Sequence, residues 1–117
     1  MQPRRYNCGL DAAIDVIGGR WKSLVLWALH EHPLRFGELK RRVSGISEKM
    51  LTESLRELEH DGIVHREAYP EIPPRVEYSL TERGQALNTA LLTLGDWGEQ
   101  NMHHIAERRG VLPAPRH

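Results

Sequence analysis

The 117-residue sequence predicts a domain of the α+β class, mainly α-helical with one small β-hairpin. Two observations predict this class. Apolar side chains recur with the helical period of about 3.6 up to residue 61, and the period changes to about 2 between residues 63 and 80 before a helical period returns. The length is close to the usual size of one domain, so we expect residues 1–117 to fold as a single unit.

The first two expected helices supply much of the core. Residues 9–18 have apolar side chains at the i, i+3, i+4 and i+7 spacing of a helix with one buried face, and Gly18-Gly19 ends this helix. The next helix begins near Arg20 and carries apolar side chains, including Leu24 and Trp27, over most of its circumference. A helix of that kind belongs in the middle of a core, so we expect it there.

The next two helices predict a helix-turn-helix. A short helix over residues 35–43 is followed by a turn in which Gly45 supplies the permissive backbone. Ser47 is a suitable N-cap for a helix over residues 47–61, and Gly62 stands where a C-cap glycine is expected. Two short helices joined by a turn that contains glycine, with the second capped and polar on its outer face, are typical of a helix-turn-helix.

A β-hairpin is expected directly after these helices. Residues 63–69 and 75–80 have the period of strands, and in the second strand Val76, Tyr78 and Leu80 alternate with polar residues. Three prolines among residues 70–74 exclude a tight two-residue turn and favour a stiff, extended loop. A hairpin in this place is a wing over residues 70–75, so we predict a winged helix-turn-helix with a DNA-binding core of about residues 20–80.

The last helix, over residues 81–108, is more apolar than a small winged domain needs for its own core. An extra apolar helix at the end of such a domain is usually buried against a second copy, so we expect a homodimer with helix 81–108 at its interface. The residues of this helix expected at the interface are Leu87, Leu91, Leu94 and Trp97. Residues 110–117 contain two prolines and no apolar period, and we expect them to be flexible.

Charge and hydropathy limit the class of protein. The longest apolar run has six residues, far fewer than the roughly 20 that cross a bilayer, and the N-terminus does not resemble a signal peptide. We therefore expect a cytoplasmic protein without a membrane partner. The net charge is zero, which taken alone argues against a nucleic-acid binder, but residues 1–42 carry +4 and residues 43–117 carry −4.

The outer face of helix 47–61 carries the candidate base contacts, because a helix fits the major groove and its first turns reach the base edges. These candidates are Ser47, Lys49, Thr52, Glu53 and Arg56. Phosphate contacts supply most of the affinity for DNA, and their candidates are Arg35, Lys40, Arg41, Arg66 and Arg75. The alternative is a solvated helix face of mixed charge, and we expect that for the acidic residues 57–61. For Arg75 the alternative is a cross-strand pair with a glutamate.

The sequence has no pattern typical of catalysis. It lacks a phosphate-binding glycine loop and a nucleophile elbow, its seven histidines are scattered, and no zinc motif surrounds the single cysteine. We therefore expect no enzyme activity, no metal and no cofactor.

Cys8 allows two interpretations. It precedes the first helix and lies near Arg4 and Arg5, and both a helix N-terminus and nearby cations favour the reactive thiolate of a cysteine. Cys8 is accordingly a candidate redox sensor that would pair with a small thiol or with Cys8 of the partner subunit. A small residue packed at a helix start is the alternative.

Motifs over residues 8–98 carry a family resemblance. In order they are Cys8, the run from Ile17 to Lys22, Arg35-Phe36 with Leu39, Gly45-Ile46-Ser47, Leu51-Thr52, the run from Leu55 to Leu58, Asp61-Gly62, the run from Pro73 to Thr81, and Trp97-Gly98. Together they resemble the HxlR-type family of bacterial winged helix-turn-helix regulators, which are relatives of the MarR group. The resemblance implies a homodimer built from the first and last helices, 9–18 and 81–108, which adds Leu10 and Ile14 to the expected interface. It implies operator binding through residues 47–56 and no enzyme activity. It also implies that some relatives sense oxidants or electrophiles at the cysteine that matches Cys8.

The sequence thus predicts a homodimeric transcriptional regulator of double-stranded DNA, with repression expected and activation left open. Its operator would be pseudo-palindromic, and an oxidant, an electrophile or an aromatic compound would be its effector. Two alternatives stay open. One is a winged-helix module that binds protein and not DNA, and the other is a regulator with a non-covalent ligand near Trp21, Trp27 and Trp97 at the dimer interface.

Overall fold

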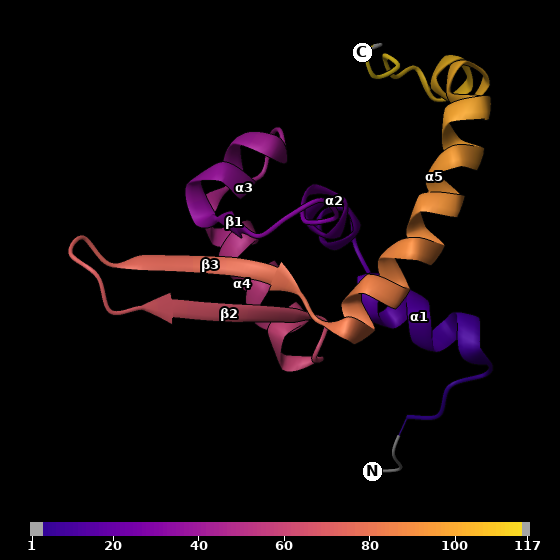
Figure 1. Cartoon of the computed structure of the whole chain (residues 1–117). Helices are drawn as coiled ribbons and strands as arrows, with labels where there is room; N and C mark the ends of the chain where they lie inside the picture. The colour runs from indigo at the N-terminus through magenta and orange to yellow at the C-terminus, as the bar shows by residue number, and fades with distance from the viewer. Residues whose placement is uncertain (1–3, 116–117) are drawn as a thin grey trace.

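The computed structural model describes residues 4–115 and confirms the α+β class. Its elements are α1 (Gly9–Ile17), α2 (Trp21–Ala28), β1 (Leu34–Arg35), α3 (Phe36–Arg42), α4 (Glu48–His60), β2 (Val64–Tyr69), β3 (Arg75–Leu80) and α5 (Glu82–Arg109). The β2–β3 hairpin projects from the helices on one side, and α5 rises on the other side with α1 beside its first turns (Figure 1). Among the described residues, no helix is both long and apolar enough to cross a bilayer.

The core lies where α2, α3 and α4 meet the sheet. Leu26, Leu39, Leu51 and Leu58 have no exposed surface, and Leu34 joins them from β1. They come from four different elements, so the core is built from long-range contacts.

Helix α2 enters this core with one face only. Val25 and Leu26 are completely buried, whereas Trp27 is 52% exposed and Leu24 is 39% exposed. The expectation that α2 lies in the middle of the core is therefore wrong for the single chain. Helix α2 packs against α4, α5 and α3, but none of these covers the face that carries Leu24 and Trp27.

The sheet has three antiparallel strands in the order β1-β3-β2. In the hairpin Val64 lies opposite Leu80 and Tyr69 lies opposite Arg75. Strand β1 was not predicted, because two residues are too few to show a period. All six residues of β3 are half-buried, the apolar Val76, Tyr78 and Leu80 as well as the polar residues between them. β2 pairs with β3 along its whole length, whereas β1 pairs only with Glu77 and Tyr78.

The predicted caps of α4 are present. The Ser47 Oγ accepts a hydrogen bond from the backbone N–H of Met50 at 3.1 Å. Gly45 has a φ of +89° in the turn before α4, a backbone conformation that other residues rarely adopt. Local sequence signals therefore placed the helix-turn-helix correctly.

Helix α5 begins at a tight joint with the end of α4. The Thr81 hydroxyl donates to the carbonyl of Gly62 at 2.6 Å, and the Thr81 N–H donates to the carbonyl of Ile63 at 3.0 Å. The same hydroxyl accepts from the N–H of Gly84 at 3.0 Å, which caps α5. Further along, α5 bends, and its last turns point in a different direction from its first turns (Figure 1).

Candidate nucleic-acid interface

The exposed face of α4 carries three of the predicted base contacts. Lys49, Glu53 and Arg56 are exposed, and their i, i+4, i+7 spacing places them on one stripe opposite the buried leucines. Thr52 is half-buried on the side of the sheet, and Ser47 uses its hydroxyl as the N-cap. The structure therefore brings Lys49, Glu53 and Arg56 together at the surface.

A polar hollow of about 420 Å³ lies between α4 and the hairpin. It is lined by Thr52, Leu55, Arg56, Glu59, Arg66 and Tyr78. Arg56 and Arg66 thus face a common space from two different elements.

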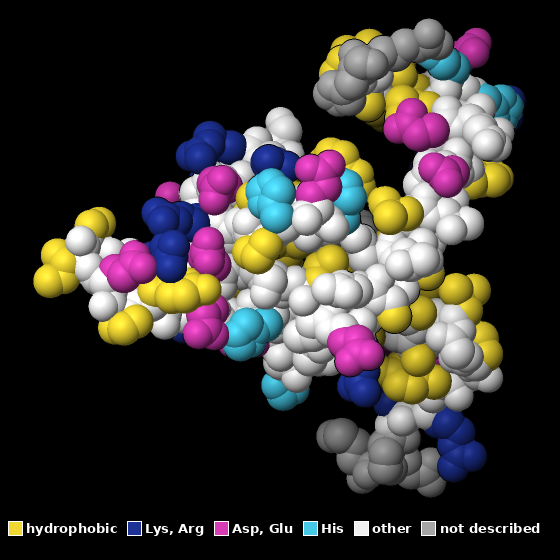
Figure 2. All heavy atoms as spheres, in the orientation of Figure 1, with side chains coloured by type: hydrophobic (Ala, Val, Ile, Leu, Met, Phe, Trp, Pro, Cys, Tyr) yellow, Lys and Arg dark blue, Asp and Glu magenta, His cyan; other side chains and the backbone are white. Residues whose placement is uncertain are grey.

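Helix α3 presents the predicted backbone contacts that precede the turn. Arg35 is the N-cap residue of α3, and its backbone N–H donates to Glu38 Oε1 at 3.0 Å. Arg41 is exposed and Lys40 is half-buried. Figure 2 shows Lys and Arg side chains over α3 and the adjoining part of β3, with carboxylates between them. Basic groups therefore gather over α3 and the adjoining part of β3 although the net charge is zero.

Arg75 lies at the base of the wing loop and is held there. Its guanidinium carbon lies 3.9 Å from the centre of the Tyr69 ring, and its Nη2 lies 3.1 Å from Glu71 Oε1. Burial is the main cause that raises the pKa of Tyr69, and the charge of the Glu77 carboxylate is the next. The glutamate that pairs with Arg75 belongs to the loop, whereas the sequence suggested a cross-strand partner as the alternative to DNA contact.

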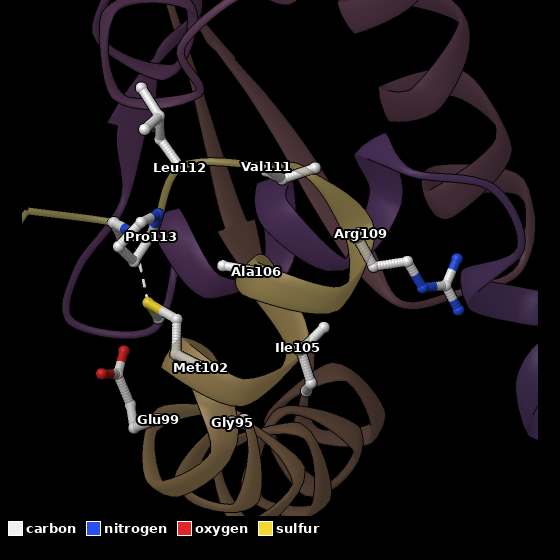
Figure 3. A pocket seen from close by; sticks show the side chains of 11 residues that line it. Gly95, Glu99, Met102, Ile105, Ala106, Arg109, Val111, Leu112 and Pro113 are labelled. Atoms are coloured by element: carbon white, nitrogen blue, oxygen red, sulfur yellow. Dashed lines mark hydrogen bonds between the residues drawn. The ribbon is translucent and has the colours of Figure 1, made fainter.

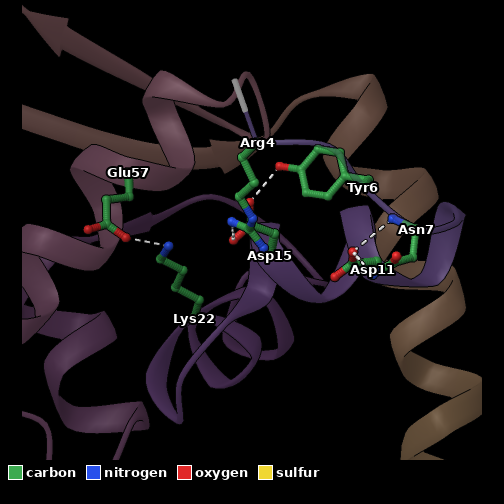
Figure 4. A network of polar contacts seen from close by, with 7 residues as sticks. All are labelled: Arg4, Tyr6, Asn7, Asp11, Asp15, Lys22 and Glu57. Carbon is green, nitrogen blue, oxygen red and sulfur yellow. Dashed lines mark hydrogen bonds and ion pairs between the residues drawn. The ribbon is translucent and has the colours of Figure 1, made fainter. Parts of the chain in front are cut away.

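The acidic end of α4 is not simply solvated. Glu57 forms an ion pair with Lys22 of α2 (Figure 4). The Lys22 side chain is 14% exposed. The Glu57 side chain is 61% exposed, so this acidic face is solvated as expected, but Glu57 also has a partner that the sequence did not indicate. The pair joins two helices far apart in sequence, and no local pattern indicates it.

The N-terminal arm, residues 4–7, is bound to α1 (Figure 4). The Tyr6 hydroxyl donates to Asp15 Oδ2 at 2.5 Å, and Arg4 Nη1 lies 3.2 Å from Asp15 Oδ1. The hydrogen bonds from Tyr6 and Arg4 lower the pKa of Asp15, and the bond to Asp15 raises the pKa of Tyr6. Asp15 therefore remains ionised and Tyr6 protonated at neutral pH, which are the forms that this contact needs.

Cys8 is the N-cap residue of α1, and its thiol is exposed. The residue before it is fixed, because the Asn7 N–H donates to Asp11 Oδ2 at 3.0 Å. The Cys8 side chain makes no capping hydrogen bond. The backbone on both sides of Cys8 is thus held while its thiol faces solvent.

The predicted interface residues fall into two groups. Leu10, Ile14, Leu94 and Trp97 are between 50% and 70% exposed. Leu87 and Leu91 are half-buried and pack against the core of their own chain. The exposed group lies on α1 and on the middle of α5.

The chain after α5 folds back along that helix. Residues 111–114 and one side of α5, including Met102 and Ile105, line an apolar hollow of about 400 Å³ (Figure 3). The Ala114 N–H lies 3.1 Å from the Met102 Sδ.

Trp21 lines a separate hollow of about 190 Å³ between the α1–α2 turn and α4. Neither Trp27 nor Trp97 lines that hollow. In the single chain, Trp21 therefore lines this hollow without the other two tryptophans. Across residues 4–115, no group of three or more histidine, cysteine or acidic residues is arranged to hold a metal.

Comparisons with known proteins point to one family. A family model described as HxlR-like helix-turn-helix matches residues 16–106. An uncharacterised HTH-type transcriptional regulator of Methanothermobacter thermautotrophicus is 50% identical over 99 residues, which cover 85% of this chain and 76% of that protein.

Solved structures agree. The redox regulator HypR in its oxidised form is 48% identical with a TM-score of 0.76, over 80% of this chain and 97% of that chain. Diamide-treated YodB from Bacillus subtilis is 38% identical with a TM-score of 0.69, over 82% of this chain and 96% of that chain. These matches confirm the resemblance inferred from the motifs. The chain belongs to the HxlR-like helix-turn-helix family of transcriptional regulators.

Proposed function

We propose that the protein is a homodimeric regulator that binds a pseudo-palindromic operator, with α4 in the major groove and the wing loop on the flanking groove. The observation that carries this proposal is the exposed stripe of Lys49, Glu53 and Arg56 on a capped helix. Side chains near the start of such a helix reach base edges, and half-sites of a dimer lie about one helical turn apart. Basic groups of α3 and β2 beside α4 would contact the phosphates.

Replacing Lys49 by alanine should weaken operator binding and relax its base preference. A lysine that contacts a guanine edge contributes roughly 1–3 kcal/mol of discrimination, so the specific duplex should lose about tenfold or more in affinity. The duplex would be selected from a random library with the wild-type protein, and the dissociation constants would be measured by fluorescence anisotropy.

Arg108→Ala is the matched control, because it removes one positive charge from the far end of α5. It should leave binding nearly unchanged. The alternative is a winged-helix module that binds protein and not DNA. It would replace this proposal if the wild type selected no duplex from the library and its weak binding to DNA showed no dependence on salt. A DNA reader loses affinity with a log–log slope of about −0.9 per phosphate contacted.

The dimer is supported by α1, which contains no buried residue in the single chain although Leu10 and Ile14 are apolar. A nine-residue helix is marginal in water without packing partners. The exposed side chains of α5 offer a similar unpaired face. A second copy would cover both faces at once.

We also propose that Cys8 is a regulatory thiol. The support is its exposed thiol on a fixed backbone at the start of α1, together with the similarity to HypR and YodB. With diamide, Cys8 and Cys8 of the partner subunit would give two electrons and two protons to the oxidant and form one disulfide. A small thiol could take the place of the second cysteine, and an electrophile could alkylate Cys8 directly. Any of these would shift α1 at the dimer interface and change the separation of the two α4 helices.

Diamide should lower the operator affinity of the wild type by about tenfold or more, which is within the usual range of coupling between two sites. Cys8→Ser should keep its affinity, because the chain has no other cysteine. Gel shift with and without dithiothreitol measures the effect, and intact mass identifies the product. Loss of binding by oxidised Cys8→Ser to the same extent would rule out the sensor.

A further inference from the structure

The polar hollow between α4 and the hairpin has the geometry of a phosphate site. Alternate residues of a strand point to the same face, so Arg66 shares a face of β2 with Val64, which is 2% exposed. Across the ladder Arg66 lies opposite Tyr78, which also lines the hollow. Arg66 therefore points to the side on which α4 supplies Arg56.

The two guanidinium groups in this hollow are free to bind a ligand. Neither Arg56 nor Arg66 forms an ion pair with a carboxylate of residues 4–115, whereas Arg75 is paired with Glu71 and Arg4 with Asp15. Glu59 is the one acidic residue among those that line the hollow. The hollow thus carries a formal excess of one positive charge, with the hydroxyls of Thr52 and Tyr78 as further hydrogen-bond donors.

The position of Arg56 along α4 favours the DNA backbone over the bases. Arg56 lies seven residues after Lys49, which is about 10 Å further along the helix axis. Bases are read by residues near the N-terminus of a recognition helix. Between a helix in the major groove and a wing on the adjoining groove, the element of DNA that passes is the sugar-phosphate backbone.

We propose that Arg56 and Arg66 together bind one phosphate of the operator backbone in this hollow. The inference rests on the proposed function and changes the role of Arg56 from base contact to phosphate contact. A guanidinium fork matches two phosphate oxygens, and two forks from different elements fix the position of one phosphate between α4 and the wing. Glu59 weakens the site by its negative charge.

The test measures operator affinity over a range of salt concentrations for Arg56→Gln, Arg66→Gln, the double variant and Glu59→Gln. Each single arginine variant should lose about tenfold or more in affinity for the selected operator and for a scrambled duplex alike, and the log–log salt slope should fall by about one. The double variant should lose little more than either single variant, because both side chains hold the same phosphate. Glu59→Gln should bind both duplexes more tightly.

Three further measurements locate the phosphate, control for charge and check folding. A methylphosphonate placed at successive positions of the duplex should, at one position only, remove the effect of both arginine substitutions. Arg108→Gln is the control for loss of one charge, and circular dichroism melting checks that every variant is folded.

Three results would overturn the shared phosphate site. They are a change of base preference in Arg56→Gln, additive losses in the double variant, and two separate sensitive positions in the methylphosphonate scan. A different result would show that the proposed function itself is wrong. In that case the affinity of the wild type for every duplex would show no dependence on salt.

Discussion

Gly84→Ala should destabilise the folded protein by about 3 kcal/mol, at the upper end for an overpacked site, and lower its melting temperature by roughly 10–15 °C. A Cβ atom at position 84 would lie 2.1 Å from the carbonyl oxygen of Ile63 and 3.1 Å from its carbonyl carbon. These are backbone atoms, and the same oxygen accepts the hydrogen bond from the Thr81 N–H. The added methyl group can therefore be accommodated only by opening the joint between α5 and the end of α4.

Gly95→Ala is the matched control. Position 95 is also within α5, and nothing lies within 4 Å of a Cβ placed there. Alanine favours the helix over glycine by up to about 1 kcal/mol, so this variant should be as stable as the wild type or more stable. Thermal and urea unfolding at one protein concentration measure both variants. A melting temperature for Gly84→Ala within two or three degrees of the wild type would refute the close approach. Such a shift corresponds to a loss of less than about 1 kcal/mol in the free energy of unfolding.

The second large effect concerns the exposed apolar face. Trp97→Asp should weaken the proposed dimer by about 4 kcal/mol, or roughly a thousandfold in its dissociation constant. Trp97 is 57% exposed in the single chain and neighbours Leu94, which is 59% exposed. A carboxylate there would be taken out of water when a second copy covers the face. Operator affinity should fall as the dimer is weakened, because one subunit reads only one half-site.

Sedimentation velocity over a range of concentrations measures the change. Ile72→Asp is the control, since it places the same charge at a fully exposed apolar residue of the wing loop and should leave the oligomeric state unchanged. The proposed interface would be disproved by a Trp97→Asp protein that dimerises as tightly as the wild type.

Local sequence patterns predicted most of the fold. The Ser47 cap, the glycines of the turns and the change of period after residue 62 depend on neighbours in the sequence, and the sequence predicted these elements almost to the residue. The pair of Lys22 with Glu57 and the short strand β1 depend on segments that meet only after folding. They leave no periodic signal along the chain.

The apolar stripe of α5 shows the same limit. Leu91 packs against the core of its own chain, whereas Leu94, nearly one turn later, is exposed. Both are leucines on one amphipathic helix, so the sequence could place them on a stripe. It could not show where the domain ends and a partner surface begins, because that depends on how far the core reaches along α5.

Arg75 has a further consequence for the thermodynamics of binding. Its stacking on Tyr69, its pair with Glu71 and three prolines hold the wing loop in shape without DNA. Ordering a flexible residue costs about 1–2 kcal/mol of conformational entropy, and a loop that is already ordered adds none of this cost to complex formation. Arg75 is therefore less free to move toward a phosphate, and the wing loop is stiffer. With no net charge, it would obtain from preorganisation part of the affinity that basic domains obtain from counterion release.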